Sequence, residues 1–125
     1  MKITSFNPMI VTEKSEEIIA FFEELGFEKK HKKKSTDNEE IYNTILEDSN
    51  SFKLDIIQTN ELPQGKDIMA IRINVDDFDE AYAFLLERGF KNIHGDKISD
   101  TGTSRTAILL SPSGFAIDLL QHIKE

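Results

Sequence analysis

Two aspartates stand in otherwise apolar runs at matching points of the chain. Residues 52–58 read FKLDIIQ around Asp55, and residues 115–121 read FAIDLLQ around Asp118. A carboxylate in an apolar strand is costly unless a cation or hydrogen-bond donors pair with it. With Arg72 expected near by, the pair could bind a cationic ligand, hold a hard metal ion or supply a general base. The alternatives are hydration near a strand end and a purely structural ion pair with Arg72.

The two runs belong to an internal repeat that covers most of the chain. Residues 7–58 align without a gap on residues 70–121, with the same residue at many paired positions, among them Gly26 and Gly89, Phe27 and Phe90, His31 and His94, Ile45 and Ile108, Asp55 and Asp118, and Gln58 and Gln121. Self-similarity at a fixed spacing indicates that one structural unit occurs twice in the chain. The repeat therefore constrains the architecture before any single motif is considered.

Each repeat has the hydrophobic periods of a strand, a helix and three further strands. The first strands are predicted at residues 3–11 and 69–75, and each helix is expected to stop at a glycine, Gly26 or Gly89. Thr12 or Ser15 is the expected cap of the first helix, and Asp76 or Asp77 that of the second. The remaining strands are predicted at about 27–34, 40–46 and 52–59, and at 90–98, 104–110 and 115–122.

These elements predict an α+β fold of tandem βαβββ modules that form a curved mixed sheet around a concave pocket. The first module covers about residues 1–59, a linker with Pro63 and Gly65 covers 60–66, and the second module covers about 67–125. We expect both modules to form one domain, since a single half would leave one sheet face bare.

Strand alternation divides each predicted sheet into a face under the helix and a face turned away from it. Ile71, Ile73 and Val75 are expected under the second helix, and Pro8 and Ile10 under the first. The residues of opposite parity, together with the two aspartates, make up the predicted ligand-binding set: Asn7, Met9, Asp55, Ile57, Ala70, Arg72, Asp118 and Leu120. An apolar cavity with a few polar groups is the usual composition of a small-molecule site.

The composition narrows the setting in which such a site would work. The 125 residues carry 15 Lys and Arg against 23 Asp and Glu, a net charge of −8, and no cysteine. Disulfides, iron–sulfur clusters and thiolate zinc sites are therefore excluded, and the negative charge argues against nucleic-acid or anionic membrane partners. With no apolar stretch of a signal peptide or membrane span, we expect a cytoplasmic protein.

The sequence resembles the vicinal oxygen chelate superfamily over nearly its whole length. The resemblance rests on the helix ends AFFEELGF (20–27) and AFLLERGF (83–90) and on SPSGFAIDLL (111–120). That superfamily includes glyoxalase I, extradiol dioxygenases, and fosfomycin-resistance and bleomycin-binding proteins. The resemblance implies the paired-module fold and a plausible homodimer, but it leaves the activity open because the superfamily hosts several chemistries.

The superfamily's metal enzymes place His, Gln or Glu on each first strand and Glu on a last strand. The matching positions in this chain are Asn7 and Ala70, and Asp55 and Asp118. Ala70 has no ligand atom and an amide is a weak ligand for a transition metal, so we expect no cofactor. Two aspartates with waters could still hold Mg²⁺ or Mn²⁺.

The histidines and the basic run are interpreted as ordinary surface. His31 lies within the basic segment 28–34, His94 is its repeat equivalent and His122 lies near the C-terminus, and none is expected on the face of the two aspartates. The lysines around His31 are expected to protect a strand edge from pairing with another chain.

Three functions remain open at this stage. The favoured one is a metal-free protein that binds a small molecule, with the acidic pair selecting a cationic drug or metabolite. The alternative is a divergent metal-dependent lyase, isomerase or dioxygenase that uses Asp55 and Asp118. The third is a vestigial cavity in a structural or partner-binding subunit.

Overall fold

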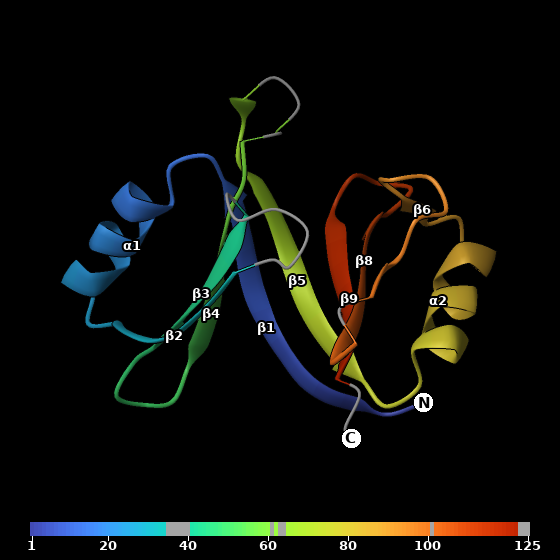
Figure 1. The fold of residues 1–125 in the computed structure, drawn as a ribbon, viewed down its shortest axis with the longest axis horizontal. Coiled ribbons are helices and arrows are strands. Elements are labelled where there is room, and N and C mark those ends of the chain that lie inside the picture. The colour runs from blue at the N-terminus through green and yellow to red at the C-terminus, as the bar shows by residue number, and fades with distance from the viewer. Residues whose placement is uncertain (35–40, 61, 63–64, 101, 123–125) are drawn as a thin grey trace. The chain divides into compact units, whose positions relative to one another are not determined.

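A computed structural model of the protein describes residues 1–34, 41–60, 62, 65–100 and 102–122. Parts of the predicted strand at 40–46, of the linker and of the C-terminus lie outside these ranges. The elements, shown in Figure 1, are β1 (Ile3–Thr12), α1 (Ser15–Glu24), β2 (Glu28–Lys34), β3 (Tyr42–Glu47), β4 (Lys53–Gln58), β5 (Ile68–Val75), α2 (Phe78–Glu87), β6 (Lys91–Asn92), β7 (Ser99–Asp100), β8 (Ser104–Leu110) and β9 (Ala116–His122). The predicted α+β class with tandem βαβββ repeats is confirmed.

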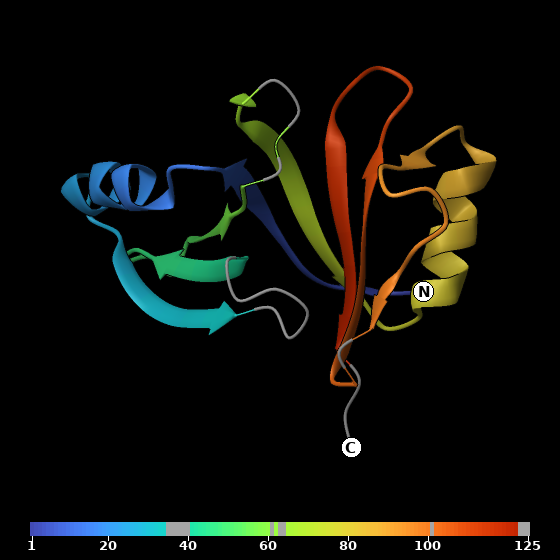
Figure 2. The ribbon, with the colours of Figure 1, turned by 45° about the horizontal axis from the view of Figure 1, so that its top comes forward.

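Contacts group the chain into two compact units. The first-repeat unit is Asn7–Met69, and the second-repeat unit combines Met1–Phe6 with Ala70–Glu125. In the first-repeat unit the strand order is β2-β3-β4-β1, with β1 and β4 parallel. In the second it is β5-β9-β8-β6, with β7 on β8 and the β8–β9 hairpin in orange and red in Figure 2.

One helix packs on one face of each unit's sheet. Under α1 the buried core comprises Ile19, Leu46, Leu54 and Ile56, with Ile10, Ile18, Phe22 and Phe27 partly buried around them. Under α2 it comprises Val75, Phe78, Ala81, Ala107, Leu109, Ile117 and Leu119. The predicted parity holds for Ile10, Ile73 and Val75, whereas Pro8 is exposed and takes no part in the core.

The two helix starts differ between the repeats. Asp77 caps α2 as predicted, because its Oδ1 accepts the Glu80 amide at 3.0 Å. Neither Thr12 nor Ser15 caps α1: the N-cap position is Lys14, which makes no side-chain cap bond, and Ser15 is the first helical residue. The Thr12 hydroxyl instead accepts the Lys14 amide at 3.0 Å, so its local hydrogen bond shapes the turn before the helix.

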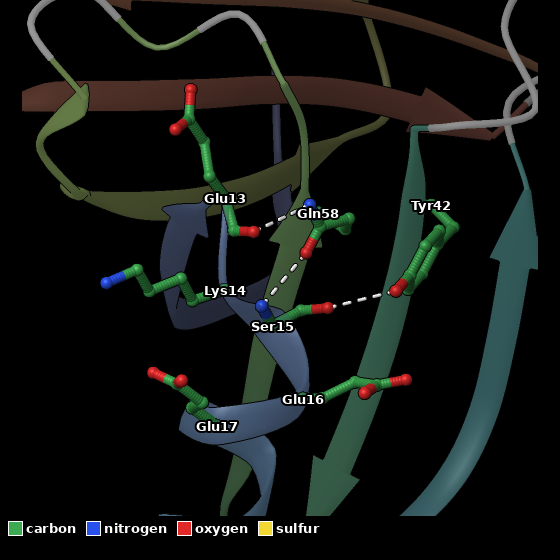
Figure 3. Close-up of a pocket in the computed structure, with 7 residues that line it drawn as sticks. All are labelled: Glu13, Lys14, Ser15, Glu16, Glu17, Tyr42 and Gln58. Atoms are coloured by element: carbon green, nitrogen blue, oxygen red, sulfur yellow. Dashed lines mark hydrogen bonds between the residues drawn. The ribbon is translucent and has the colours of Figure 1, made fainter.

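The identical glutamines of the repeat tie the last strand of each unit to its helix. Gln58 Oε1 accepts the Ser15 amide at 2.9 Å, and its Nε2 donates to the Glu13 carbonyl at 3.0 Å (Figure 3). Gln121 repeats the arrangement on the Phe78 amide at 2.7 Å and the Asp76 carbonyl at 2.9 Å. The two repeats therefore share individual hydrogen bonds as well as the order of their elements.

The prediction of a single strand at residues 90–98 is wrong. Only Lys91–Asn92 pairs with β8, and a turn then leads to the short β7. The buried Asn92 side chain accepts the His94 amide at 2.9 Å and donates to the Lys97 carbonyl at 2.9 Å, while Gly95 has φ +77°. A side chain that hydrogen-bonds the local backbone competes with strand pairing and favours a turn.

Within the described residues, no helix has the length and apolar character needed to cross a membrane.

Candidate ligand-binding faces

The helix-free face of the first-repeat unit carries Asp55 in a row of cross-strand neighbours. Since Leu54 and Ile56 pack under α1, the alternation of β4 turns Asp55 to the other face. Met9 of β1 and Ile45 of β3 are its register partners. Both Met9, at 0% exposure, and Asp55, at 3%, are buried. The acid is thus flanked by apolar side chains along the row.

Two amides of the same unit hold the Asp55 carboxylate. The Asn7 Nδ2 group donates to Oδ2, and the Asn43 Nδ2 group donates to Oδ1 at 3.1 Å. Because the Asn43 amide nitrogen faces Asp55, the side-chain carbonyl of Asn43 points away from it. The Oδ1 atom of that carbonyl is buried and has no hydrogen-bond partner. Hydrogen bonds to a carboxylate are stronger than those between neutral groups, so the two amides fix its orientation.

Asp118 holds the matching position on the helix-free face of the second-repeat unit. It is 5% exposed, accepts from the Thr106 hydroxyl at 2.8 Å and lies with its Oδ2 3.6 Å from Arg72 Nε. Arg72 is also its register partner on β5. An ion pair between Arg72 and one aspartate, which the sequence offered as the structural alternative, is therefore present at Asp118.

The eight predicted residues divide equally between the two units. Asn7 contacts Asp55, Met9 pairs with it across the strands, and Ile57 follows two residues later on β4. Ala70, Arg72, Asp118 and Leu120 lie in the second-repeat unit, where Ala70 and Leu120 are both 4% exposed. A single cavity lined by both sets stays a prediction.

Asn43 and Thr106 were missed by the sequence reasoning. They occupy the same repeat position, and each donates to the aspartate of its own unit. Their register partners, Ile57 and Leu120, belong to the predicted set. The sequence gives a partial signal, because a polar residue recurs at one position of the repeat and shares the parity of the binding face, but which acid it contacts depends on the register between strands.

The donor set does not fit the metal site that the resemblance implies. Among the residues that the structure describes, no group of three or more His, Asp or Glu side chains could hold a metal ion. Asn7 and Asn43 point amide hydrogens at Asp55, and a guanidinium stands beside Asp118. Metal ligands must offer lone pairs, so hydrogens and a neighbouring cation both oppose coordination.

The placement of two histidines differs from the prediction. His31 is the register partner of Ile45, and His122 that of Ser104, so both share the parity of the aspartate faces. Both are exposed. The bulge between Lys29 and His31 shifts the register by one residue, which no period in the sequence reveals.

A separate open pocket of about 310 Å³ lies at the start of α1 in the first-repeat unit. Figure 3 shows its lining, which is Glu13, Lys14, Ser15, Glu16, Glu17, Tyr42 and Gln58. The Ser15 and Tyr42 hydroxyls lie 3.1 Å apart and satisfy one another. Since Gln58 is occupied by the backbone bonds described above, these groups serve mainly to anchor the helix start.

Solved structures with the same fold were found, although no curated protein matches the sequence. A methylmalonyl-CoA epimerase from Mycobacterium tuberculosis is 15% identical with a TM-score of 0.69, covering 98% of this chain and 90% of its own. A hypothetical protein from Bacillus halodurans C-125 is 17% identical with a TM-score of 0.69, covering 98% of both chains. The Streptomyces coelicolor methylmalonyl-CoA epimerase in complex with 2-nitronate-propionyl-CoA is 16% identical with a TM-score of 0.68, covering 98% and 100%.

The likeness to these structures supports the fold, and the sequence itself supplies the family. Residues 4–119 match the family described as Glyoxalase/Bleomycin resistance protein/Dioxygenase superfamily. The match takes in both repeats, both aspartates and the glutamine of the first repeat. The chain therefore belongs to the glyoxalase/bleomycin resistance protein/dioxygenase superfamily.

Proposed function

We propose that the protein binds a small molecule without a metal, and that the helix-free face of the first-repeat unit holds it. The ligand would carry a cationic group, such as the ammonium of a drug or metabolite. The observation that supports this most directly is Asp55, a buried carboxylate flanked by Met9 and Ile45 and oriented by two amides.

The surroundings of Asp55 favour strong recognition of a cation. An ion pair gains more in an apolar environment than in water, provided that the geometry is good and the remaining hydrogen bonds are made. The amides of Asn7 and Asn43 already fix the carboxylate, so little orientational freedom remains to be lost when a ligand binds.

Asp118 would play a different part. With the Arg72 guanidinium 3.6 Å away, it presents an acceptor and a donor side by side. Such a pair suits a neutral polar group better than a cation, because Arg72 would repel a positive charge. The proposal thus assigns the cation to Asp55.

Measuring the metal content of the purified protein distinguishes this proposal from the enzymatic alternative. A divergent lyase, isomerase or dioxygenase would need Asp55 and Asp118 to hold a divalent cation, and their hydrogen-bond partners oppose that role. Elemental analysis of protein purified without chelators should find no stoichiometric metal. A metal present at one equivalent and lost in Asp55→Ala or Asp118→Ala would favour the enzyme.

The proposal also includes a cytoplasmic homodimer. The absence of cysteine suits a reducing compartment, and the sequence resemblance suggests the dimer. Light scattering on the eluting protein would give twice the chain mass of 14.3 kDa if this is correct.

Thermal unfolding in the presence of primary amines tests the binding function. A ligand that binds only the folded protein, at one hundred times its Kd, stabilises it by about 2.7 kcal/mol and raises Tm by about 10 °C. We expect such a shift for wild type and for the control Asp96→Asn, which changes an exposed acid, but not for Asp55→Asn. No shift with any amine, or an undiminished shift in Asp55→Asn, would contradict the proposal.

A further inference from the structure

A row of cross-strand neighbours joins an acid to a base on one face of the first-repeat unit. Asp55 on β4 pairs with Ile45 on β3, and Ile45 pairs with His31 on β2. Leu46, the neighbour of Ile45, is buried under α1, so Ile45 and its partners point to the helix-free face. The row therefore runs from a carboxylate through an aliphatic side chain to an imidazole.

The environment changes along this row from buried to open. Asp55 is 3% exposed, Ile45 is partly buried and His31 is exposed on β2, the last strand in the order of this unit. Adjacent strands lie about 4.8 Å apart, which places the strand positions of Asp55 and His31 about 10 Å from one another. The three side chains thus follow one another across the strands, with the acid at the buried end of the row and the imidazole at the open end.

The strand that carries His31 is also strongly basic. Lys29, Lys30 and Lys32 are exposed around it, and only Glu28, 3.3 Å from the Lys30 ammonium, offsets them within the described part of the strand. On a chain with a net charge of −8 this concentration of positive charge is local. Lys29 and Lys32 pair with Leu46 and Thr44, so they lie on the α1 side of β2, and their charge adds to the positive potential around His31 without lining the row.

We propose that this row makes the protein selective for ligands with a cationic group and a carboxylate about 10 Å apart, joined by an apolar chain. The inference rests on the proposed function, because it takes Asp55 as the cation anchor. Ile45 would pack against the chain, and His31 would hydrogen-bond the carboxylate as the specificity-determining residue.

Calorimetric titration with two matched probes tests this selectivity. The probes are 8-aminooctanoate, whose charged ends lie about 10 Å apart when extended and so match two strand spacings, and octylamine, which lacks the carboxylate. One added charge-assisted hydrogen bond corresponds to about tenfold tighter binding of 8-aminooctanoate by wild type. His31→Leu, which has no donor, should remove most of that preference and leave octylamine binding unchanged.

His94 supplies a matched control, because it is the repeat equivalent of His31 but lies in the turn after β6. His94→Leu should keep the full preference. Equal affinity of wild type for the two probes, or an unchanged preference in His31→Leu, would overturn this inference and leave the proposed function intact. Failure of wild type to bind either probe would reject the cation anchor, and with it both proposals.

Discussion

Replacing Asn43 by threonine should stabilise the protein, although the substitution removes an amide that holds a buried acid. The repeat itself suggests this change, because Thr106 stands at the equivalent position and its hydroxyl reaches Asp118 at 2.8 Å. A threonine at position 43 can therefore keep a donor on Asp55. What it removes is the buried Oδ1 of Asn43, which has no partner.

The magnitude follows from the cost of that unpartnered acceptor. A buried polar atom without a hydrogen bond costs about 1–3 kcal/mol, and threonine also suits a strand better than asparagine. We expect Asn43→Thr to raise the free energy of unfolding by about 1 kcal/mol, the lower end of the range, since the new hydroxyl must find its own geometry. Tm should rise by about 4 °C for a chain of this size.

Urea unfolding followed by circular dichroism measures the effect directly. The midpoint should move to higher urea without a change in slope, which would show that stability and not the unfolded state has changed. The reciprocal Thr106→Asn places an unpaired carbonyl in the second-repeat unit and should lower the midpoint. Loss of more than about 1 kcal/mol in Asn43→Thr would refute the reasoning, because it would show that the Asn43 carbonyl is satisfied or that threonine cannot reach Asp55.

Two further substitutions test the second acid and a strained turn. Arg72→Met removes the cation 3.6 Å from the buried Asp118 and should lower the free energy of unfolding, measured by urea titration, by about 3 kcal/mol. The control Arg72→Lys keeps the charge and should cost much less. Equal losses in the two variants would show that charge is not the cause. Ser51 has φ +65°, a left-handed conformation that favours glycine, and its repeat equivalent is Gly114. Ser51→Gly should therefore raise the free energy of unfolding by up to about 1 kcal/mol. An unchanged or lower Tm would show that the serine is not strained.

The fold could be predicted because its signals are local and occur twice. The period of the strands, the glycines that end both helices and the polar turns recur in each repeat, so each interpretation was supported by an independent copy. The failure at residues 90–98 has a physical reason. There the second copy departs from the first, and a buried Asn92 satisfies the local backbone in place of a partner strand.

The candidate site could be predicted only in part. Alternation alone indicates that Asp55 and Asp118 turn away from the helices, because parity is a property of one strand. The partners of these acids depend on register, which is set between strands. Asn43 and Thr106 therefore escaped notice, and a bulge in β2 brought His31 to a face from which its position in the sequence had excluded it.

The opening strand carries a consequence for any attempt to separate the repeats. Its first residues belong to the second-repeat unit, where the Lys2 amide donates to Asp76 Oδ1 at 2.6 Å, the Asp76 amide donates to the Lys2 carbonyl at 3.1 Å, and the Thr4 hydroxyl donates to the Asn74 carbonyl. A fragment beginning at Ala70 would leave one border of β5 unprotected and prone to self-association. A circularly permuted fragment that also carries residues 1–6 should restore this border and remain monomeric.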